Sequence, residues 1–163
     1  MSIRMSLNFS DFKDLQKKIE KAAGLGALED AAEAALKESA QYVNKRLETA
    51  MEPHRRSGQT EKSLQTKAKP KKLSAGEISI DVGYKIRKGR QVNLASIVVM
   101  HGAAAHNIYR YYGTPKKKPT TIEHPGITAD EKVYDAAFGP AVDKKVQEIQ
   151  RKSLEKAAEK LFK

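Results

Sequence analysis

The chain has 163 residues and a mass of 18.1 kDa, which is enough for one domain with a single hydrophobic core. It contains no cysteine, so disulfides, zinc–thiolate sites and cysteine nucleophiles are excluded. The sequence has no run of about 18 apolar residues that would predict a membrane-spanning helix. Residues 1–9 lack the apolar run of a secretory signal, and we therefore expect cytoplasmic synthesis.

The positive charge is concentrated in the middle of the chain. The net charge is +11, and residues 53–118 hold 15 basic and 3 acidic residues. Such a field favours an anionic partner, which can be nucleic acid, a membrane surface or an acidic protein face. A solvated basic surface gives the same pattern, so charge alone leaves these interpretations open.

The N-terminal third shows the spacing of two amphipathic helices. The first is expected to end at Gly24 and Gly26 and to begin after Asn8 or Ser10 as N-cap. Its apolar residues are Phe12, Leu15, Ile19 and Ala22. The second is expected from about residue 28 to residue 51, where Pro53 stops it. Its stripe is rich in alanine, which lets a sheet approach closely.

Beyond Pro53 the apolar period changes to two, which is typical of half-buried strands. One expected strand alternates through Leu64, Thr66 and Ala68, and another through Ile78, Ile80 and Val82. The turn-forming residues between them predict a hairpin connection: Pro70, Ser74, Ala75 and Gly76.

The apolar run Ala95–Met100 predicts the central strand of the sheet, with Ile97 and Val98 in the core. A further strand is expected at residues 107–112. The stretch between Gly113 and Gly126 contains three prolines and is expected to be an irregular loop.

Helical spacing returns after Thr128, which is expected to cap a short helix over residues 129–138. Gly139 and Pro140 interrupt it, and a final helix is expected to about Phe162. Its apolar face is expected to be Val142, Val146, Ile149, Ser153, Ala157 and Leu161. The sequence thus predicts an α+β fold, with N-terminal helices, a small, mostly antiparallel sheet packed on a long helix, and a C-terminal helix. We expect residues 1–26 to form an N-terminal helical arm and residues 27–163 a single domain.

Residue patterns for catalysis are weak in this sequence. A facial metal triad of Glu123, His124 and Asp130 is conceivable, but histidines on polar loops give the same pattern. The Gly24–Gly26 pair lacks the third glycine and the preceding strand of a nucleotide-binding motif. No carboxylate pair suggests a general acid and base. We therefore expect a protein without enzymatic activity, cofactor or metal.

The segment that follows the long helix, Met51–Leu64, resembles the motif of phage tail-completion (head–tail joining or neck) proteins of the minor tail component type. In that family a helix ends at a proline, a small hydroxyl residue and a glycine follow, and a basic, serine and aliphatic step starts the first strand. The matching residues are Pro53, Ser57, Gly58, Lys62, Ser63 and Leu64. The chain departs from the pattern by extra residues after Pro53 and by Thr60 in place of an apolar residue.

Later residues extend the resemblance over about residues 28–162. Val82-Gly83 matches the end of a family strand, and Phe138 with Pro140-Ala141-Val142 matches the opening of the final helix. The family's aromatic-Gly-Thr step fits Tyr112-Gly113-Thr114 literally, whereas Met100-His101-Gly102 better fits the position after an apolar strand. Both registers stay open, and the stretch between Gly102 and Ile127 is an insertion relative to the short family form.

The resemblance implies a virion structural protein in the tail or neck, made in the cytoplasm of a host bacterium. Members form rings, often hexameric, that contact the connector or head-completion protein on one side and tail-tube or tail-terminator subunits on the other. They are not enzymes, need no cofactor and bind no membrane. The alternative is a basic protein that binds nucleic acid without sequence preference, in which Tyr109, Tyr111 and Tyr112 around Arg110 could stack on bases or could be half-buried strand residues.

Two basic clusters are the candidate contacts with partners or DNA. One lies in residues 83–93 and the other between Gly113 and Gly126; together they comprise Lys85, Arg87, Lys88, Arg90, Lys116, Lys117 and Lys118. In a ring whose bore passes the genome, these residues would make weak, sequence-independent contacts with phosphate. Docking on an acidic protein face is the competing and slightly favoured interpretation.

Overall fold

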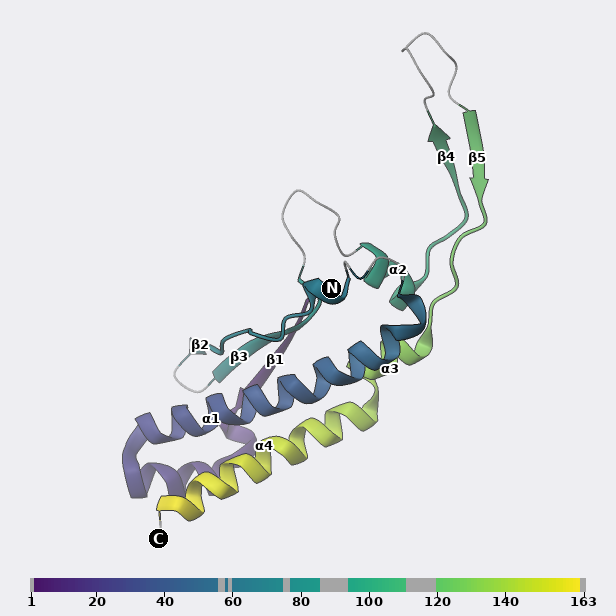
Figure 1. Cartoon of the computed structure of the whole chain (residues 1–163). Coiled ribbons are helices and arrows are strands. Elements are labelled where there is room, and N and C mark those ends of the chain that lie inside the picture. Colours follow the sequence, from purple (N-terminus) through teal and green to yellow (C-terminus); the bar gives the residue numbers. More distant parts are fainter. Residues whose placement is uncertain are drawn as a thin grey trace.

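The computed structural model describes residues 2–55, 58, 60–74, 77–85, 94–110 and 120–161. It confirms the α+β fold, with two long helices, a three-stranded antiparallel sheet and a separate two-stranded hairpin (Figure 1). The strands and α-helices are β1 (Ser2–Asn8), α1 (Lys13–Met51), β2 (Lys71–Ser74), β3 (Glu77–Gly83), α2 (Leu94–His101), β4 (His106–Arg110), β5 (Thr120–His124), α3 (Glu131–Phe138) and α4 (Pro140–Leu161). Short 3-10 helices lie at Phe9–Phe12, Glu52–His54 and Glu61–Ser63.

Both expected N-terminal helices belong to α1, which bends where they meet. Gly24 adopts φ 78° and ψ 179° inside α1, a conformation that glycine reaches without steric cost. Asn8 caps the 3-10 helix before α1 by accepting a hydrogen bond from the Ser10 backbone N–H at 2.9 Å. At the other end α1 stops at Met51, and Pro53 lies in the following 3-10 helix. The boundaries predicted at Gly24 and Pro53 are therefore confirmed.

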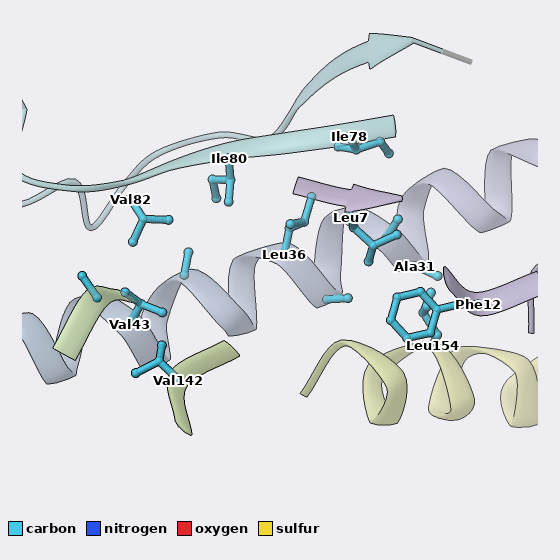
Figure 2. Close-up of a cluster of buried hydrophobic side chains, with 14 of the residues drawn as sticks. Leu7, Phe12, Ala31, Leu36, Val43, Ile78, Ile80, Val82, Val142 and Leu154 are labelled. Carbon is cyan, nitrogen blue, oxygen red and sulfur yellow. The ribbon is translucent and has the colours of Figure 1, made fainter. Parts of the chain in front are cut away.

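The core lies on two sides of α1, which runs between the sheet and α4 (Figure 2). Leu7 of β1 and Ile80 and Val82 of β3 are buried against α1. From the opposite side α4 contributes Val142 and Leu154. The alanine-rich stripe allows this close approach, since Ala31, Ala32, Ala35 and Ala40 are all buried. Each fully buried Val, Leu or Ile stabilises the fold by about 1.5–3 kcal/mol relative to an exposed one.

The sheet has the order β1-β3-β2, and both outer strands are antiparallel to β3. The expected strand at Ile78–Val82 is confirmed as part of β3. The expected strand through Leu64, Thr66 and Ala68 was wrong, because Leu64 forms only an isolated bridge with Tyr84. The partner of β3 is instead β2, whose four residues are all exposed and therefore carry no apolar alternation. Residues 1–26, expected as a helical arm, contain β1 and the first part of α1.

The apolar run Ala95–Met100 is helix α2, so the predicted central strand was wrong. Ser96 and Met100, four residues apart, are buried, whereas Ile97 and Val98 are half-buried. Burial at a spacing of four is helical, and a short apolar run does not distinguish a strand from a buried helix. The centre of the sheet is β3, whose two neighbours, β1 and β2, both precede it in the sequence.

The strand expected at residues 107–112 is confirmed as β4 over residues 106–110, but its partner was not anticipated. Residues 120–124, expected as irregular loop, form β5 and pair with β4 in an antiparallel hairpin. The short helix α3 begins at Glu131, and Asp130 rather than Thr128 caps it, by accepting a hydrogen bond from the Lys132 N–H. The final helix is confirmed as α4.

Candidate assembly surface

The β4–β5 hairpin stands away from the helices and from the three-stranded sheet (Figure 1). Its base is a narrow crossing of two chain segments. Ala103 and Ile127 exchange backbone hydrogen bonds of 2.8 and 2.9 Å. Gly102 and Gly126 flank this bridge with φ of 73° and 88°, and a Cβ on either would lie within 2.8 Å of a backbone oxygen across the bridge. Only glycine fits at both positions, so this close crossing of the two segments depends on Gly102 and Gly126.

The segment that leaves the hairpin is attached to the body through Asp130. The Asp130 N–H donates to the Val99 carbonyl of α2 at 2.7 Å, and Asp130 Oδ2 lies 2.8 Å from His54 Nε2, just after α1. The His54 hydrogen bond, with the Lys132 N–H, lowers the pKa of Asp130 below its ordinary value. One carboxylate thus links the end of α1 to the start of α3 beside the hairpin base.

Among the basic candidates, Lys85 is described. It is exposed two residues after β3, and its backbone N–H donates to the Ser63 carbonyl. The other six lie outside the described residues: Arg87, Lys88, Arg90, Lys116, Lys117 and Lys118. Part of the described charge is already compensated, because Lys71 pairs with Asp81 at 3.2 Å and Lys72 pairs with Glu29. Within the described chain, the basic residues that form no ion pair include Lys62, Lys67, Lys69 and Lys85.

A groove of about 800 Å³ runs between β1 and the first half of α4. Its sides are Arg4–Ser6 of β1 and residues 142–151 of α4. Its apolar lining includes Met5, Phe12, Val43, Val82, Phe138, Val142 and Val146. Met5, Phe138 and Val146 are only half-buried, so apolar surface stays open to the groove.

One polar group in this groove has no partner within the described chain. The Gln150 side chain is 4% exposed, and its Nε2 makes no hydrogen bond. An unsatisfied buried donor costs about 1–3 kcal/mol. Asp11 and Asp143 also line the groove and form no ion pair with a described residue. The lining of the groove therefore contains a buried amide donor without an acceptor, and two carboxylates and one lysine, Lys144, that form no ion pair with described residues.

The described family-motif positions lie around the sheet and α4. Gly83 ends β3 with φ 86°, and its N–H donates to Asn44 Oδ1 of α1 at 3.0 Å. Leu64 forms an isolated β-bridge with Tyr84. The buried Tyr84 hydroxyl donates a hydrogen bond to the Leu47 carbonyl. Burial, together with the nearby carboxylates of Glu48 and Glu61, raises the pKa of Tyr84 to about 12. Gly58 has φ 69°, Ser63 ends a 3-10 helix, Phe138 ends α3 and Pro140 begins α4. Ser57, Gly113 and Thr114 lie outside the described residues.

The structure does not bring the conceivable metal triad together. Asp130 is engaged by His54, and His124 Nδ1 accepts a hydrogen bond from the Gly126 N–H at 3.1 Å. In the part of the chain that the structure describes, no group of three or more His, Asp or Glu residues could hold a metal ion. The same described helices include none with the length and apolar character needed to cross a membrane.

Comparisons of the chain with protein-family models, curated proteins and solved structures find no match. The groove and the hairpin therefore have to be interpreted from their own geometry. Sequence reasoning had missed the groove because it had missed β1. A signal was present, since apolar and polar residues alternate strictly from residue 3 to residue 8: Ile3, Arg4, Met5, Ser6, Leu7 and Asn8.

Proposed function

We propose that this chain is a bacteriophage virion structural protein, a tail-completion or neck component that joins the head connector to the tail tube as a ring. The number of copies that the resemblance suggests is six. The chain acts by binding neighbours and not by catalysis, and it needs no cofactor. Its contacts are other copies of itself, the connector or head-completion protein, and tail-tube or tail-terminator subunits.

The observation that carries this proposal is the order of the elements around the motif residues. A long helix ends just before Pro53, β3 ends at Val82-Gly83, and Pro140 opens the C-terminal helix that packs along α1. These three are places that motif residues hold in the family that the sequence resembles, whereas Lys62-Ser63-Leu64, which starts the first strand in that family, here ends a 3-10 helix and forms only an isolated bridge. The projecting hairpin and the open groove further support a protein that docks on neighbours. The outer edges of the hairpin have no strand partner among the described residues, and the groove leaves apolar side chains partly exposed.

The test is self-assembly of the purified full-length chain. Light scattering coupled to size exclusion, over a wide concentration range, should show oligomers, and negative-stain images should show closed rings. A chain that stays monomeric at all concentrations and binds DNA in a salt-sensitive way would contradict the proposal. That result would favour the basic nucleic-acid-binding alternative, since phosphate contacts weaken steeply with salt.

A further inference from the structure

The two edges of the three-stranded sheet differ in how well they are protected against pairing. β2 is four residues long, has a register irregularity between Lys72 and Ser74, and carries Lys71 and Lys72. Short length, irregularity and lysines are the usual protection of an edge strand. β1 has seven residues in regular register with β3, and its other edge has no strand partner in the described chain. The β1 edge is thus the one open to strand addition.

The groove lies directly beside this open edge. A strand added to β1 would lie over the half-buried Met5, Phe138 and Val146 and between β1 and α4. If the Gln150 side chain turns toward the groove, a backbone carbonyl of that strand would give its buried Nε2 the acceptor that it lacks. The partner that fits is therefore an extended segment with apolar residues and an available backbone edge.

The β4–β5 hairpin of another copy has these properties. It projects from the body, and each strand has one partner only among the described residues, so both outer edges are open. The register pairs Ile108 with Ile122, which supplies apolar residues. A two-stranded hairpin is marginally stable alone in water, so joining a three-stranded sheet would stabilise it.

The unpaired charge in the groove also fits a basic partner. Residues 106–124 hold four basic residues against one acidic residue. Among the charged residues of the groove that form no ion pair with described residues, Asp11 and Asp143 outnumber Lys144, whereas Lys71 and Lys72 of β2 already pair with Asp81 and Glu29. The unpaired charge of the groove is therefore negative by one and attracts a basic hairpin.

We propose that the β4–β5 hairpin of one copy adds to the free edge of β1 of the next copy and lies in the groove between β1 and α4. This inference rests on the proposed ring, for which it names the subunit contact. The contact joins two different surfaces, so it is head-to-tail, and repetition gives a closed ring when the rotation between copies closes.

Cross-linking tests the contact directly, because the chain has no cysteine of its own. A Ser6→Cys chain is mixed with a size-tagged Thr121→Cys chain and treated with a short bismaleimide, which tolerates a shift in strand register. The expected product joins the tagged and untagged chains. The matched control replaces Ser6→Cys by Leu73→Cys on β2, which is 47% exposed and should give little mixed product.

A second variant separates assembly from folding. Gln150→Met removes the unpartnered donor and keeps the side-chain volume similar. Its melting temperature as a monomer should be unchanged or higher, whereas its association should weaken about tenfold, as expected for one lost hydrogen bond. The matched control is Gln41→Met, at an exposed position of α1 outside the groove, and it should change neither quantity.

Complementation tests the head-to-tail arrangement. Asp143→Lys impairs the groove and Ile108→Lys impairs the hairpin, so each variant alone should stay monomeric at a concentration at which the wild type assembles. Their mixture should give a complex of two chains, because the intact hairpin of the first fits the intact groove of the second. Asp30→Lys makes the same charge change at an exposed position of α1 outside the groove and should assemble normally.

The outcomes distinguish this inference from the proposed function. Rings without the mixed cross-link, or with unchanged association of Gln150→Met, overturn the hairpin contact and leave the ring in place. A mixed cross-link in open chains that never close supports the contact and contradicts the ring. A chain that neither assembles nor gives the cross-link overturns both.

Discussion

Asn44 holds three parts of the fold together from a buried position on α1. Its side chain is 6% exposed. Its Nδ2 donates to the Gln65 carbonyl and its Oδ1 accepts from the Gly83 N–H, both at 3.0 Å. The Gln65 N–H in turn donates to the Gly83 carbonyl at 2.8 Å. Asn44 therefore fixes the end of β3 and the segment after the Glu61–Ser63 helix against α1.

We expect Asn44→Leu to destabilise the protein although it fills a similar volume. The buried Gly83 N–H would lose its acceptor at a cost of about 2 kcal/mol, and the partly buried Gln65 carbonyl would lose a donor at about 1 kcal/mol. The sum of about 3 kcal/mol corresponds to a melting temperature about 6–12 °C lower for a chain of this size. Thermal and urea unfolding, followed by circular dichroism, measure both quantities.

The control is Gln41→Leu, at an exposed position on the preceding turn of α1. It makes a comparable amide-to-leucine change and should stay within about 0.5 kcal/mol of the wild type. If Asn44→Leu also stays within that range, the two hydrogen bonds do not hold the sheet on α1 and the reasoning is refuted.

Two further predictions concern the attachment of the hairpin. Gly126→Ala should lower the melting temperature and speed amide exchange at Ala103 and Ile127. The reason is that Gly126 has φ 88° and a new Cβ there would lie 2.6 Å from the Ala103 carbonyl oxygen. Unchanged amide exchange would contradict the close crossing of the two segments. The lowered pKa of Asp130 means that its charged form stabilises the fold above the unfolded pKa, and this contribution is lost as the pH falls through the lower folded pKa. The melting temperature of Asp130→Asn, which keeps a good N-cap, should therefore fall less than that of the wild type between about pH 5 and pH 3, and parallel curves would exclude this role of the His54–Asp130 contact.

Periodicity predicted the elements whose pattern lies within one segment. α1, β3 and α4 each show several apolar residues at the spacing of their own structure, and their bounds fall close to the expected ones. Periodicity failed for elements whose structure depends on contacts with distant parts of the chain. β1 pairs with residues 69 to 81 positions later, and α2 is an apolar run too short to show a period.

The sequence pattern of α4 predicted the helix but did not correctly predict which of its residues are buried. The expected line ran through Ile149, Ser153 and Ala157, which are half-buried. Val142 of the expected face is buried, but farther along α4 the buried line is shifted by one residue and contains Gln150, Leu154 and Ala158. The choice between such adjacent lines depends on how α4 is rotated against α1, which is a property of packing and not of the helix alone.

That shift is what makes Gln150 informative about the candidate surface. On the expected face it is an ordinary polar residue beside the apolar line, whereas on the observed face it is an amide inside it. A chain that worked alone would be more stable with an apolar residue there, since an unsatisfied buried amide costs about 1–3 kcal/mol. In the proposed contact the cost is removed if the Gln150 side chain turns toward the groove and a neighbour's backbone supplies the acceptor. Gln150 thus supports the proposed contact independently of the family resemblance, which rests on residues elsewhere in the chain.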